Sequence, residues 1–427
     1  MQLKVNINHI LISFIIILAS LRGVFVYHLG LSPSIAYPFA AFLLICFGVL
    51  SLLYLLGSNP RTQLVLFWNA VKLNAFFGVY FSIAQILVNQ KLDLGTLYSF
   101  FVFPSIFLLL KLESKWLNGI VYAITSVTVL GVLLFLKIGI DGGFDAIEVA
   151  ILTLRPGDLE YSRIGENLLP AGYQGHHHDA ANILVMCTIL LLTKCIHSKS
   201  ILSKYIYFLF YGLAFLTTLL TGSGANIVIL VFVSILIFLI LASSRTSLLL
   251  IYITIGALIS KLAIDYLSDY LYFLDHILQD QGELEGGGIF NSLNFDSVLS
   301  SVHAILFGFN FAFQVPLRFT EIAFLKILIS YGIVPFLLQL FILFSPIYYF
   351  FVHKKNKNNM FEQGYLRGSK DNHKPHLIIL AMPALAGTLT LLHYGSLLRV
   401  TSIGLYCVIL TIYFKEYLKA QNLILKS

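Results

Sequence analysis

The sequence predicts an all-α, polytopic integral membrane protein, and three observations carry that prediction. The first is composition: 58% of the 427 residues are hydrophobic and only 11% are charged, whereas soluble domains carry about 25% charged residues. The second is the recurrence of apolar runs long enough to cross about 30 Å of hydrocarbon. The third is a biased distribution of Lys and Arg between successive loops. We expect residues 1–427 to form a single transmembrane helical domain.

About twelve membrane spans are expected from these apolar runs. They cover, roughly, residues 9–28, 34–56, 64–88, 95–111, 116–138, 179–197, 203–221, 225–243, 247–265, 320–352, 377–394 and 397–414. The first run resembles a signal peptide but lacks a clear cleavage site, so we expect an uncleaved helix. Prolines inside spans, such as Pro346, are tolerated because neighbouring groups re-satisfy the freed backbone.

The placement of cations predicts which way the chain faces. If the N-terminus is cytoplasmic, most of the 27 Lys and Arg residues fall in cytoplasmic segments. The outer loops then carry only Lys91, Arg155, Arg163 and Arg318. Since cytoplasmic loops are enriched in Lys and Arg, we expect cytoplasmic N- and C-termini and an even number of spans. The net charge of +7 then reflects sidedness and does not indicate nucleic-acid binding.

Two outer loops are expected to be long and polar. They cover about residues 139–178 and 266–319, and a basic loop at about 353–376 is expected in the cytoplasm. Segments around 267–279 and 297–309 have the apolar spacing of short amphipathic helices that lie on a membrane surface. Because most of the remaining chain is apolar, we expect any chemistry at the outer loops.

Four arginines at the outer face are candidates for binding an anionic group. Arg155 and Arg163 lie in the first long loop, Arg318 lies at the end of the second, and Arg399 lies at the start of the last span. A guanidinium group offers a planar fork of donors that suits phosphate. Ordinary salt bridges within the loops, or snorkelling of Arg399 to the interface, are the alternatives.

Two residues are candidates for acid–base chemistry. Glu321 lies three residues after Arg318, so the two share a helix face; Glu321 can pair with that arginine, stabilise a helix start, or act as a general base. His178 is the last of three consecutive histidines before Asp179. Neighbouring helical residues point about 100° apart, which disfavours a shared metal. We expect one functional imidazole, oriented by Asp179 or Asn182, and no metal or other cofactor.

Three stretches of the chain, in order, form a recognisable pattern. They are His178-Asp179-Ala180-Ala181-Asn182, Leu219-Leu220-Thr221-Gly222-Ser223-Gly224-Ala225, and the stretch from Glu321 to Pro335 after the largest outer loop. Together they resemble the bacterial O-antigen polymerase and O-antigen ligase superfamily, over roughly residues 150–345. Gly224 stands where family members often carry Arg. Glu321 stands where ligases carry His, eleven residues before the Gly that matches Gly332, which favours a polymerase over a ligase.

The resemblance implies a metal-independent glycosyltransferase at the periplasmic face of the bacterial inner membrane. The donor would be a glycan on undecaprenyl pyrophosphate, and the acceptor a hydroxyl of a lipid-linked repeat unit. The four arginines would neutralise charge on the leaving pyrophosphate, and Glu321 or His178 would take the acceptor's proton. Membrane lipid and a chain-length regulator protein are further expected partners. The sequence has no Walker A motif, which fits a reaction driven by the lipid pyrophosphate.

A transporter, such as a flippase for lipid-linked oligosaccharides, is the alternative from another class. Twelve spans with both ends inside suit a carrier. Carriers usually have internal repeats and polar residues near the membrane midplane. The sequence shows no repeat, and its polar residues gather in the outer loops. An enzyme is therefore favoured.

Overall fold

The structure, a computed structural model, describes residues 7–24, 32–58, 62–89, 99–152, 163–164, 167–168, 172–174, 177–242, 306, 328, 331–362, 376–392 and 400–424. Within these ranges the chain is mostly helical. Seven of the described helices are long and apolar enough to cross a membrane. This agrees with the predicted class, a helical membrane protein.

The helices are α1 (Ile7–Ser20), α3 (Pro33–Leu56), α4 (Val65–Asn89), α6 (Ser105–Leu109), α7 (Ser114–Leu152), α9 (His177–His197), α10 (Ile201–Leu220), α11 (Gly224–Ala242), α18 (Ile333–Glu362), α19 (His376–Leu389) and α20 (Val400–Ile424). Three 3-10 turns accompany them: η1 (Thr62–Leu64), η2 (Gly172–Gln174) and η5 (Thr390–Leu392). Strands β1 (Arg163–Ile164) and β2 (Asn167–Leu168) pair antiparallel. Each predicted span contains described helix except 247–265, which lies outside the described residues.

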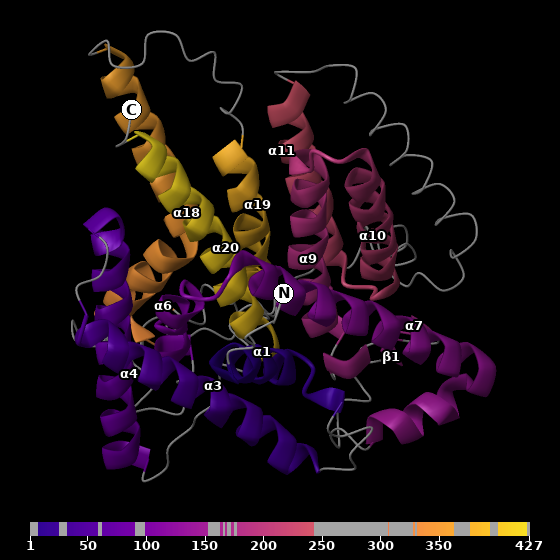
Figure 1. The fold of residues 1–427 in the computed structure, drawn as a ribbon. Helices are drawn as coiled ribbons and strands as arrows, with labels where there is room; N and C mark the ends of the chain where they lie inside the picture. Colours follow the sequence, from indigo (N-terminus) through magenta and orange to yellow (C-terminus); the bar gives the residue numbers. More distant parts are fainter. Residues whose placement is uncertain are drawn as a thin grey trace.

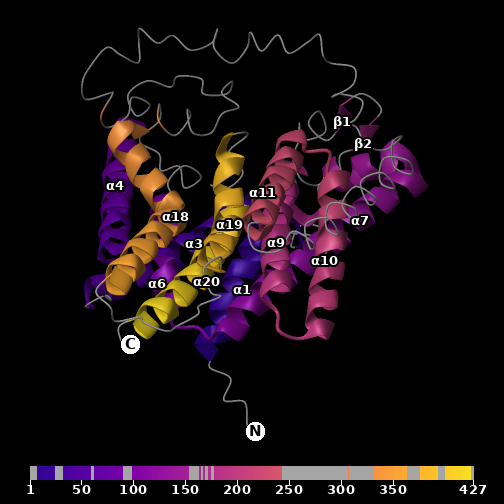
Figure 2. The ribbon, with the colours of Figure 1, turned by 90° about the horizontal axis from the view of Figure 1, so that it is seen from above.

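Helix α9 lies at the centre of the molecule. It packs against α7, α10, α11, α19 and α20, and nearly all of its side chains are buried. Figure 1 shows α9 between α10, α11 and α19, and Figure 2 shows α4 and α18 on one side of the molecule and α7 and α10 on the other. The interior position of α9 explains why its polar first turn is buried along with its apolar residues.

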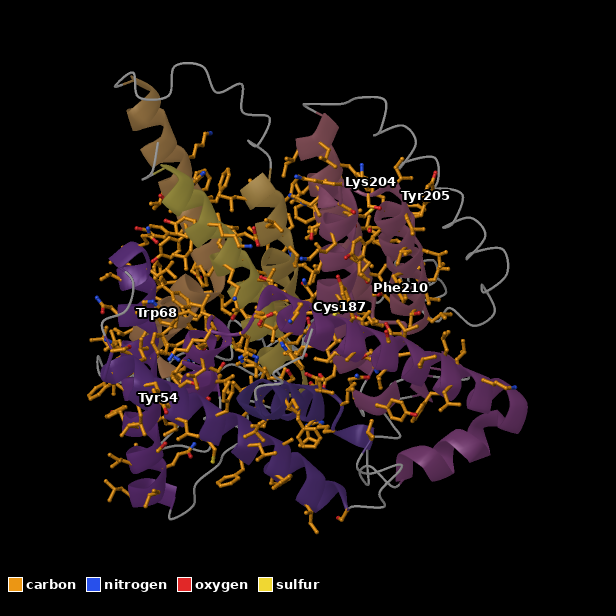
Figure 3. The ribbon with its side chains drawn as sticks, viewed as in Figure 1. Tyr54, Trp68, Cys187, Lys204, Tyr205 and Phe210 are labelled. Carbon is orange, nitrogen blue, oxygen red and sulfur yellow. The ribbon has the colours of Figure 1, made fainter. Side chains whose placement is uncertain are left out.

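Helix α10 shows the opposite pattern, with a broad exposed apolar face. Tyr205 and Phe210 point outward from it, whereas Cys187 lies in the interior (Figure 3). Exposed Leu, Phe and Tyr side chains on a long apolar helix are what a lipid environment accommodates. We therefore take α10 to be a lipid-facing helix that covers α9.

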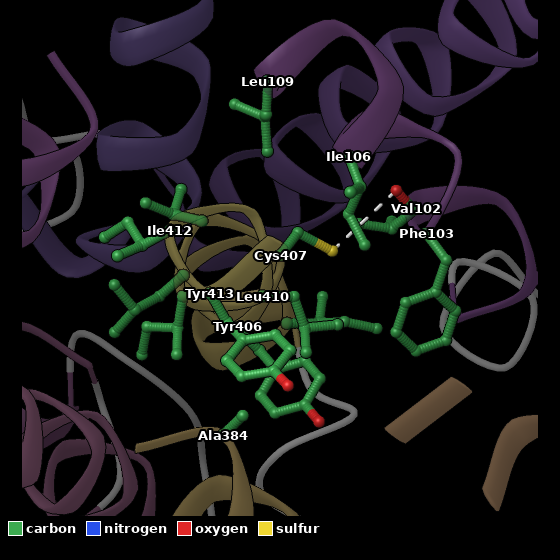
Figure 4. Close-up of a cluster of buried hydrophobic side chains, with 14 of the residues drawn as sticks. Val102, Phe103, Ile106, Leu109, Ala384, Tyr406, Cys407, Leu410, Ile412 and Tyr413 are labelled. Carbon is green, nitrogen blue, oxygen red and sulfur yellow. Dashed lines mark hydrogen bonds between the residues drawn. The ribbon is translucent and has the colours of Figure 1, made fainter. Parts of the chain in front are cut away.

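Helix α20 holds a second part of the core together. Tyr406 donates a hydrogen bond to the carbonyl of Leu343 at 2.7 Å, which ties α20 to α18. Cys407 lies against Val102, with 4.0 Å between its Sγ and the Val102 carbonyl oxygen (Figure 4). Phe103, Ile106 and Leu109 surround the same cluster. These buried contacts join segments about 300 residues apart into one core.

Pro346 lies inside α18 and removes one backbone donor from that helix. A proline cannot donate to the carbonyl four residues earlier, here that of Ile342. The hydroxyl of Ser345 donates to that carbonyl at 2.6 Å. The local sequence thus satisfies the carbonyl that the proline leaves, which is how such prolines persist inside apolar helices.

Two expected loops differ from the structure. Helix α7 continues to Leu152, so the first part of the expected loop 139–178 is helical, and α18 continues to Glu362 into the expected loop 353–376. Polar residues do not by themselves end a helix. Ala146, Glu148 and Ala150 favour helix in the extension of α7, and Lys354, Lys355 and Lys357 do so in the extension of α18. The expected loop 266–319 lies outside the described residues, apart from Leu306.

Candidate functional site

The structure describes the side chain of one predicted site residue, His178, at the start of α9. Arg163 lies on β1, opposite Leu168 in the register of the hairpin, and only its backbone is described. Arg155, Arg318, Glu321 and Arg399 lie outside the described residues. The candidate site is therefore built from the surroundings of His178.

The turn between α10 and α11 lies against His178. The Nδ1 atom of His178 is 2.8 Å from the hydroxyl oxygen of Ser223. The side-chain amide of Asn226 donates to the same hydroxyl oxygen at 2.9 Å. Ser223 is fully buried and Asn226 is nearly so. The first two stretches of the sequence pattern thus meet through this hydrogen bond.

Gly222 explains why the turn can take this shape. Its φ angle is 67°, in the left-handed region that favours glycine. Its backbone N–H bonds the carbonyl of Leu219 at 3.2 Å, which closes the end of α10. Ser223 then stands directly before α11, a position that favours serine because its side chain can serve groups at the helix start.

An ion pair lies beside this contact. A guanidinium nitrogen of Arg22 is 3.6 Å from a carboxylate oxygen of Asp179, with the two side chains 13% and 0% exposed. Arg22 follows the end of α1, and Asp179 lies in the first turn of α9, where the helix dipole favours a negative charge. The sequence offered Asp179 or Asn182 as the group that orients an imidazole, and this stays a prediction. In the structure Asp179 pairs with Arg22, and the hydroxyl group of Ser223 contacts the imidazole of His178.

The 3-10 turn η2 packs against the start of α9 and the middle of α7. The side-chain amide of Gln174 donates to the hydroxyl of Thr128 at 2.9 Å. The close approach depends on two glycines: a Cβ atom on Gly23 would lie 2.2 Å from the Tyr173 carbonyl oxygen, and one on Gly131 would lie 2.7 Å from the Tyr173 ring. This turn therefore closes the site from the side of α1 and α7.

Buried polar side chains continue inward from the site. A contact between three helices gives the depth: a Cβ atom on Gly387 of α19 would lie within 3.1 Å of both Met186 of α9 and Tyr406 of α20. Met186 and Tyr406 therefore lie at the same height in the bundle. One helical turn nearer the site, Asn182 and Ser402 occupy α9 and α20. Both are fully buried, and within the described part of the chain their side-chain polar atoms have no hydrogen-bond partner. The interior next to the site thus contains buried polar groups that the described residues leave unsatisfied.

The site lies at one end of the bundle, and lysines mark the other. Helix α9 starts at the site and carries Lys194 and His197 in its last turn. Lys204, near the start of α10, lies at that same far end (Figure 3). The described contacts at the site include a single cation, Arg22, which is paired with Asp179.

The arrangement suits binding of a polar, oxygen-rich group. Helices α9 and α11 both begin here, and their positive dipole ends favour an anion or a hydrogen-bond acceptor. The imidazole of His178 can donate or accept a proton in this position. Among the described residues, no group of three or more His, Cys, Asp and Glu residues is arranged to hold a metal ion.

Comparisons with protein-family models, with curated proteins and with solved structures found no match for this chain. The family resemblance therefore stays a prediction from the three sequence stretches. Arg22 lies in the outer half of the first predicted span, where the sequence favours burial in a polar interior, snorkelling, or a place in a cationic cavity at the outer face. Its signal was an arginine inside an otherwise apolar run, which usually indicates a buried partner.

Proposed function

We propose that the chain is an oligosaccharide repeat-unit polymerase of the bacterial inner membrane, with about twelve spans, cytoplasmic termini and a periplasmic active site. The observation that carries the proposal is the hydrogen bond between His178 and Ser223, 45 residues apart. These residues belong to two of the three stretches that resemble the O-antigen polymerase and ligase superfamily. The contact between these two stretches at a buried polar site supports the function that the resemblance implies.

The proposed reaction is a glycosyl transfer without a metal. The acceptor hydroxyl oxygen forms a bond to the anomeric carbon of the donor glycan, while the bond from that carbon to the undecaprenyl pyrophosphate oxygen breaks. The electron pair leaves with the pyrophosphate, and a base takes the acceptor's proton. Arg155, Arg163, Arg318 and Arg399 are proposed to offset the charge on the leaving group. Glu321 and His178 are proposed for the proton chemistry.

The distribution of charge supports the proposed sidedness. Lys194 and Lys204 lie at the end of the bundle opposite the site. If that basic end faces the cytoplasm, the site faces the periplasm, where a lipid-linked repeat unit would meet it. The twelve-span count needs five spans beyond the seven long helices. One of them is the predicted span at 247–265, which the apolar sequence there favours.

A glycan ladder from a deletion strain carrying plasmid-borne variants tests the proposal. We expect His178→Ala, and Ala at each of the four arginines, to shorten or abolish the polymer while expression stays normal. The matched control is His197→Ala, a change on the same helix α9 at its far end. Normal ladders from all five variants would refute the proposed site.

The same strain separates the alternatives. Loss of a polymerase leaves one repeat unit on lipid A core, whereas loss of a ligase leaves none. Purified protein in liposomes with a lipid-linked repeat unit then distinguishes an enzyme from a carrier. An enzyme lengthens the glycan, and a carrier changes only the side of the membrane on which it lies.

A further inference from the structure

Asn182 and Ser402 are buried polar side chains on two neighbouring helices, α9 and α20, and both are fully buried. Within the described part of the chain, the hydroxyl group of Ser402 has no hydrogen-bond partner, and the Asn182 carboxamide lacks one at both its nitrogen and its oxygen. Buried polar groups in native proteins are nearly always paired, because an unpaired group keeps its full desolvation cost. These two groups therefore suit a partner that the described residues do not supply.

The two side chains lie at the same height and on converging faces of their helices. A Cβ atom on Gly387 of α19 would lie within 3.1 Å of both Met186 of α9 and Tyr406 of α20. Asn182 stands four residues before Met186, and Ser402 stands four residues before Tyr406, so each lies on the same helix face, about 6 Å nearer the site. Since α9 and α20 pack against each other, the amide and the hydroxyl group line the same part of their interface.

The start of α20 explains why Ser402 is left without a partner. Inside a helix, a serine or threonine hydroxyl group often donates to the carbonyl four residues earlier, as Thr411 does to Cys407 at 2.7 Å. Ser402 is the third residue of α20, so the residue four positions earlier precedes the helix. The same holds for Thr401, whose buried hydroxyl group also lacks a partner among the described residues. The backbone N–H groups of this first turn have no partner within the helix either.

We propose that Asn182 and Ser402, together with the backbone donors at the start of α20, bind the hydroxyl groups of a sugar ring of the lipid-linked repeat unit. This rests on the proposed function and names the part of the substrate that this region takes. Asn182 lies one helical turn after His178 on the same face of α9. A sugar ring held by Asn182 and Ser402 is therefore next to the proposed site of transfer.

The chemistry of these groups suits a sugar better than a pyrophosphate. A carboxamide and a hydroxyl group carry no charge, and each can donate and accept a hydrogen bond, as a sugar hydroxyl group can. Phosphate is bound chiefly by Arg and Lys, and the Arg22 guanidinium at this end is paired with Asp179. A site built to bond a substrate hydroxyl group rejects a substrate that lacks it, because its own polar groups then stay unpaired. Asn182 and Ser402 thus set specificity for the sugar and lower the stability of the protein without substrate.

The test compares the binding of two lipid probes to the full-length protein purified in detergent. One probe is the undecaprenyl-pyrophosphate-linked repeat unit extracted from the deletion strain, and the other is undecaprenyl pyrophosphate without sugar. The probes share the lipid and the pyrophosphate, so a difference between them reports on the glycan. We expect Asn182→Leu and Ser402→Ala each to weaken binding of the glycan probe about three- to tenfold and to leave the sugar-free probe unchanged. Ser402→Thr keeps the hydroxyl group and should keep the binding.

Thr188→Val is the matched control. Thr188 is also buried on α9, and its hydroxyl group also lacks a partner within the described ranges. It lies six residues beyond Asn182, on a helix face turned away by roughly 120°, so its loss should change the binding of neither probe. The melting temperature of each variant without probe tests its folding. Asn182→Leu should melt above the wild type, so that its weaker binding cannot come from unfolding.

Four outcomes decide the inference. A wild type that binds both probes equally tightly overturns it. Equal weakening of both probes in Asn182→Leu, or a melting temperature below that of the wild type, also overturns it, because the polar groups then serve the pyrophosphate or water that belongs to the fold. Unchanged binding in both Asn182→Leu and Ser402→Ala overturns it and leaves the proposed function intact if the wild type lengthens the glycan. A glycan preference that these variants lose, in a wild type that never lengthens a glycan, refutes the polymerase and keeps the sugar site.

Discussion

The ion pair between Arg22 and Asp179 should be one of the most sensitive points of the fold. The perturbation is a double-mutant cycle with Arg22→Met, Asp179→Leu and the double variant. Asp179 is fully buried and Arg22 is 13% exposed. Removing the arginine leaves a buried carboxylate without this cation, whereas removing both charges leaves an apolar contact of similar volume.

The expected magnitude follows from the distance and the burial. At 3.6 Å and an effective dielectric constant of about 20, two unit charges attract by about 5 kcal/mol. Desolvation of the buried carboxylate offsets part of this attraction. We expect Arg22→Met to lower the free energy of unfolding by about 3–5 kcal/mol. The coupling energy of the cycle should be about 2–3 kcal/mol, since the double variant loses much less than the sum of the single variants.

Unfolding can be followed in mixed detergent micelles as the fraction of a denaturing detergent rises. A thiol-reactive dye is a suitable probe because Cys187, Cys195 and Cys407 are buried in the folded protein. The control is the pair of Lys115 and Glu113, which is shorter at 2.8 Å but 62% and 60% exposed. Solvent screening should leave that pair with little effect on stability.

The reasoning fails if the Arg22–Asp179 cycle is additive within about 0.5 kcal/mol. Additivity would mean that the buried carboxylate does not depend on this guanidinium group. It also fails if the exposed control pair shows the larger coupling, because burial would then not be the quantity that decides the strength of the interaction.

Two further predictions concern the same end of the bundle. Gly23→Ala should destabilise the protein and lower its activity, because the new Cβ atom would lie 2.2 Å from a backbone oxygen of η2. The control is Gly119→Ala on α7, where a Cβ atom would meet nothing within 4 Å, so this variant should be neutral or stabilise the protein by about 0.4–1 kcal/mol. Equal melting temperatures for the two variants would contradict this prediction. Asn182→Leu should raise the free energy of unfolding by about 1–2 kcal/mol, because neither polar atom of the buried Asn182 side chain has a partner within the described residues. A lower melting temperature of this variant in a thermal unfolding experiment would count against the prediction.

The sequence contained enough information to predict the class of fold. Apolar runs longer than the thickness of a bilayer core have few stable forms other than a helix, and the described spans follow them. The sequence predicted the ends of the helices less well than their existence. Residues 139–152 follow an apolar run and begin with a polar, glycine-containing segment, yet they continue α7. A hydropathy pattern predicts where a helix must be apolar and does not predict how far it extends into water.

The contacts of the site were harder to predict because they depend on tertiary packing. No partner could be assigned to Arg22 from the sequence, since nothing local in α1 indicates that its end meets the start of α9. The approach of η2 depends on Gly23 and Gly131, two glycines in separate helices that have no common pattern. The sequence offered only groups close along the chain, Asp179 or Asn182, as partners of the histidine, and that expectation stays untested. The structure shows that a group 45 residues away contacts that histidine.

That contact nevertheless has a simple origin in helix length. Helices α9 and α10 have 21 and 20 residues, and each residue of a helix advances the chain by about 1.5 Å. Two antiparallel helices of nearly equal length with a short connection return the chain to its starting level, so the turn after α10 must lie near His178. Each added residue would also rotate the turn by about 100°, moving Ser223 off the histidine. The spacing of 45 residues is therefore a requirement of the site, and it is the feature of the sequence that pairs the two stretches.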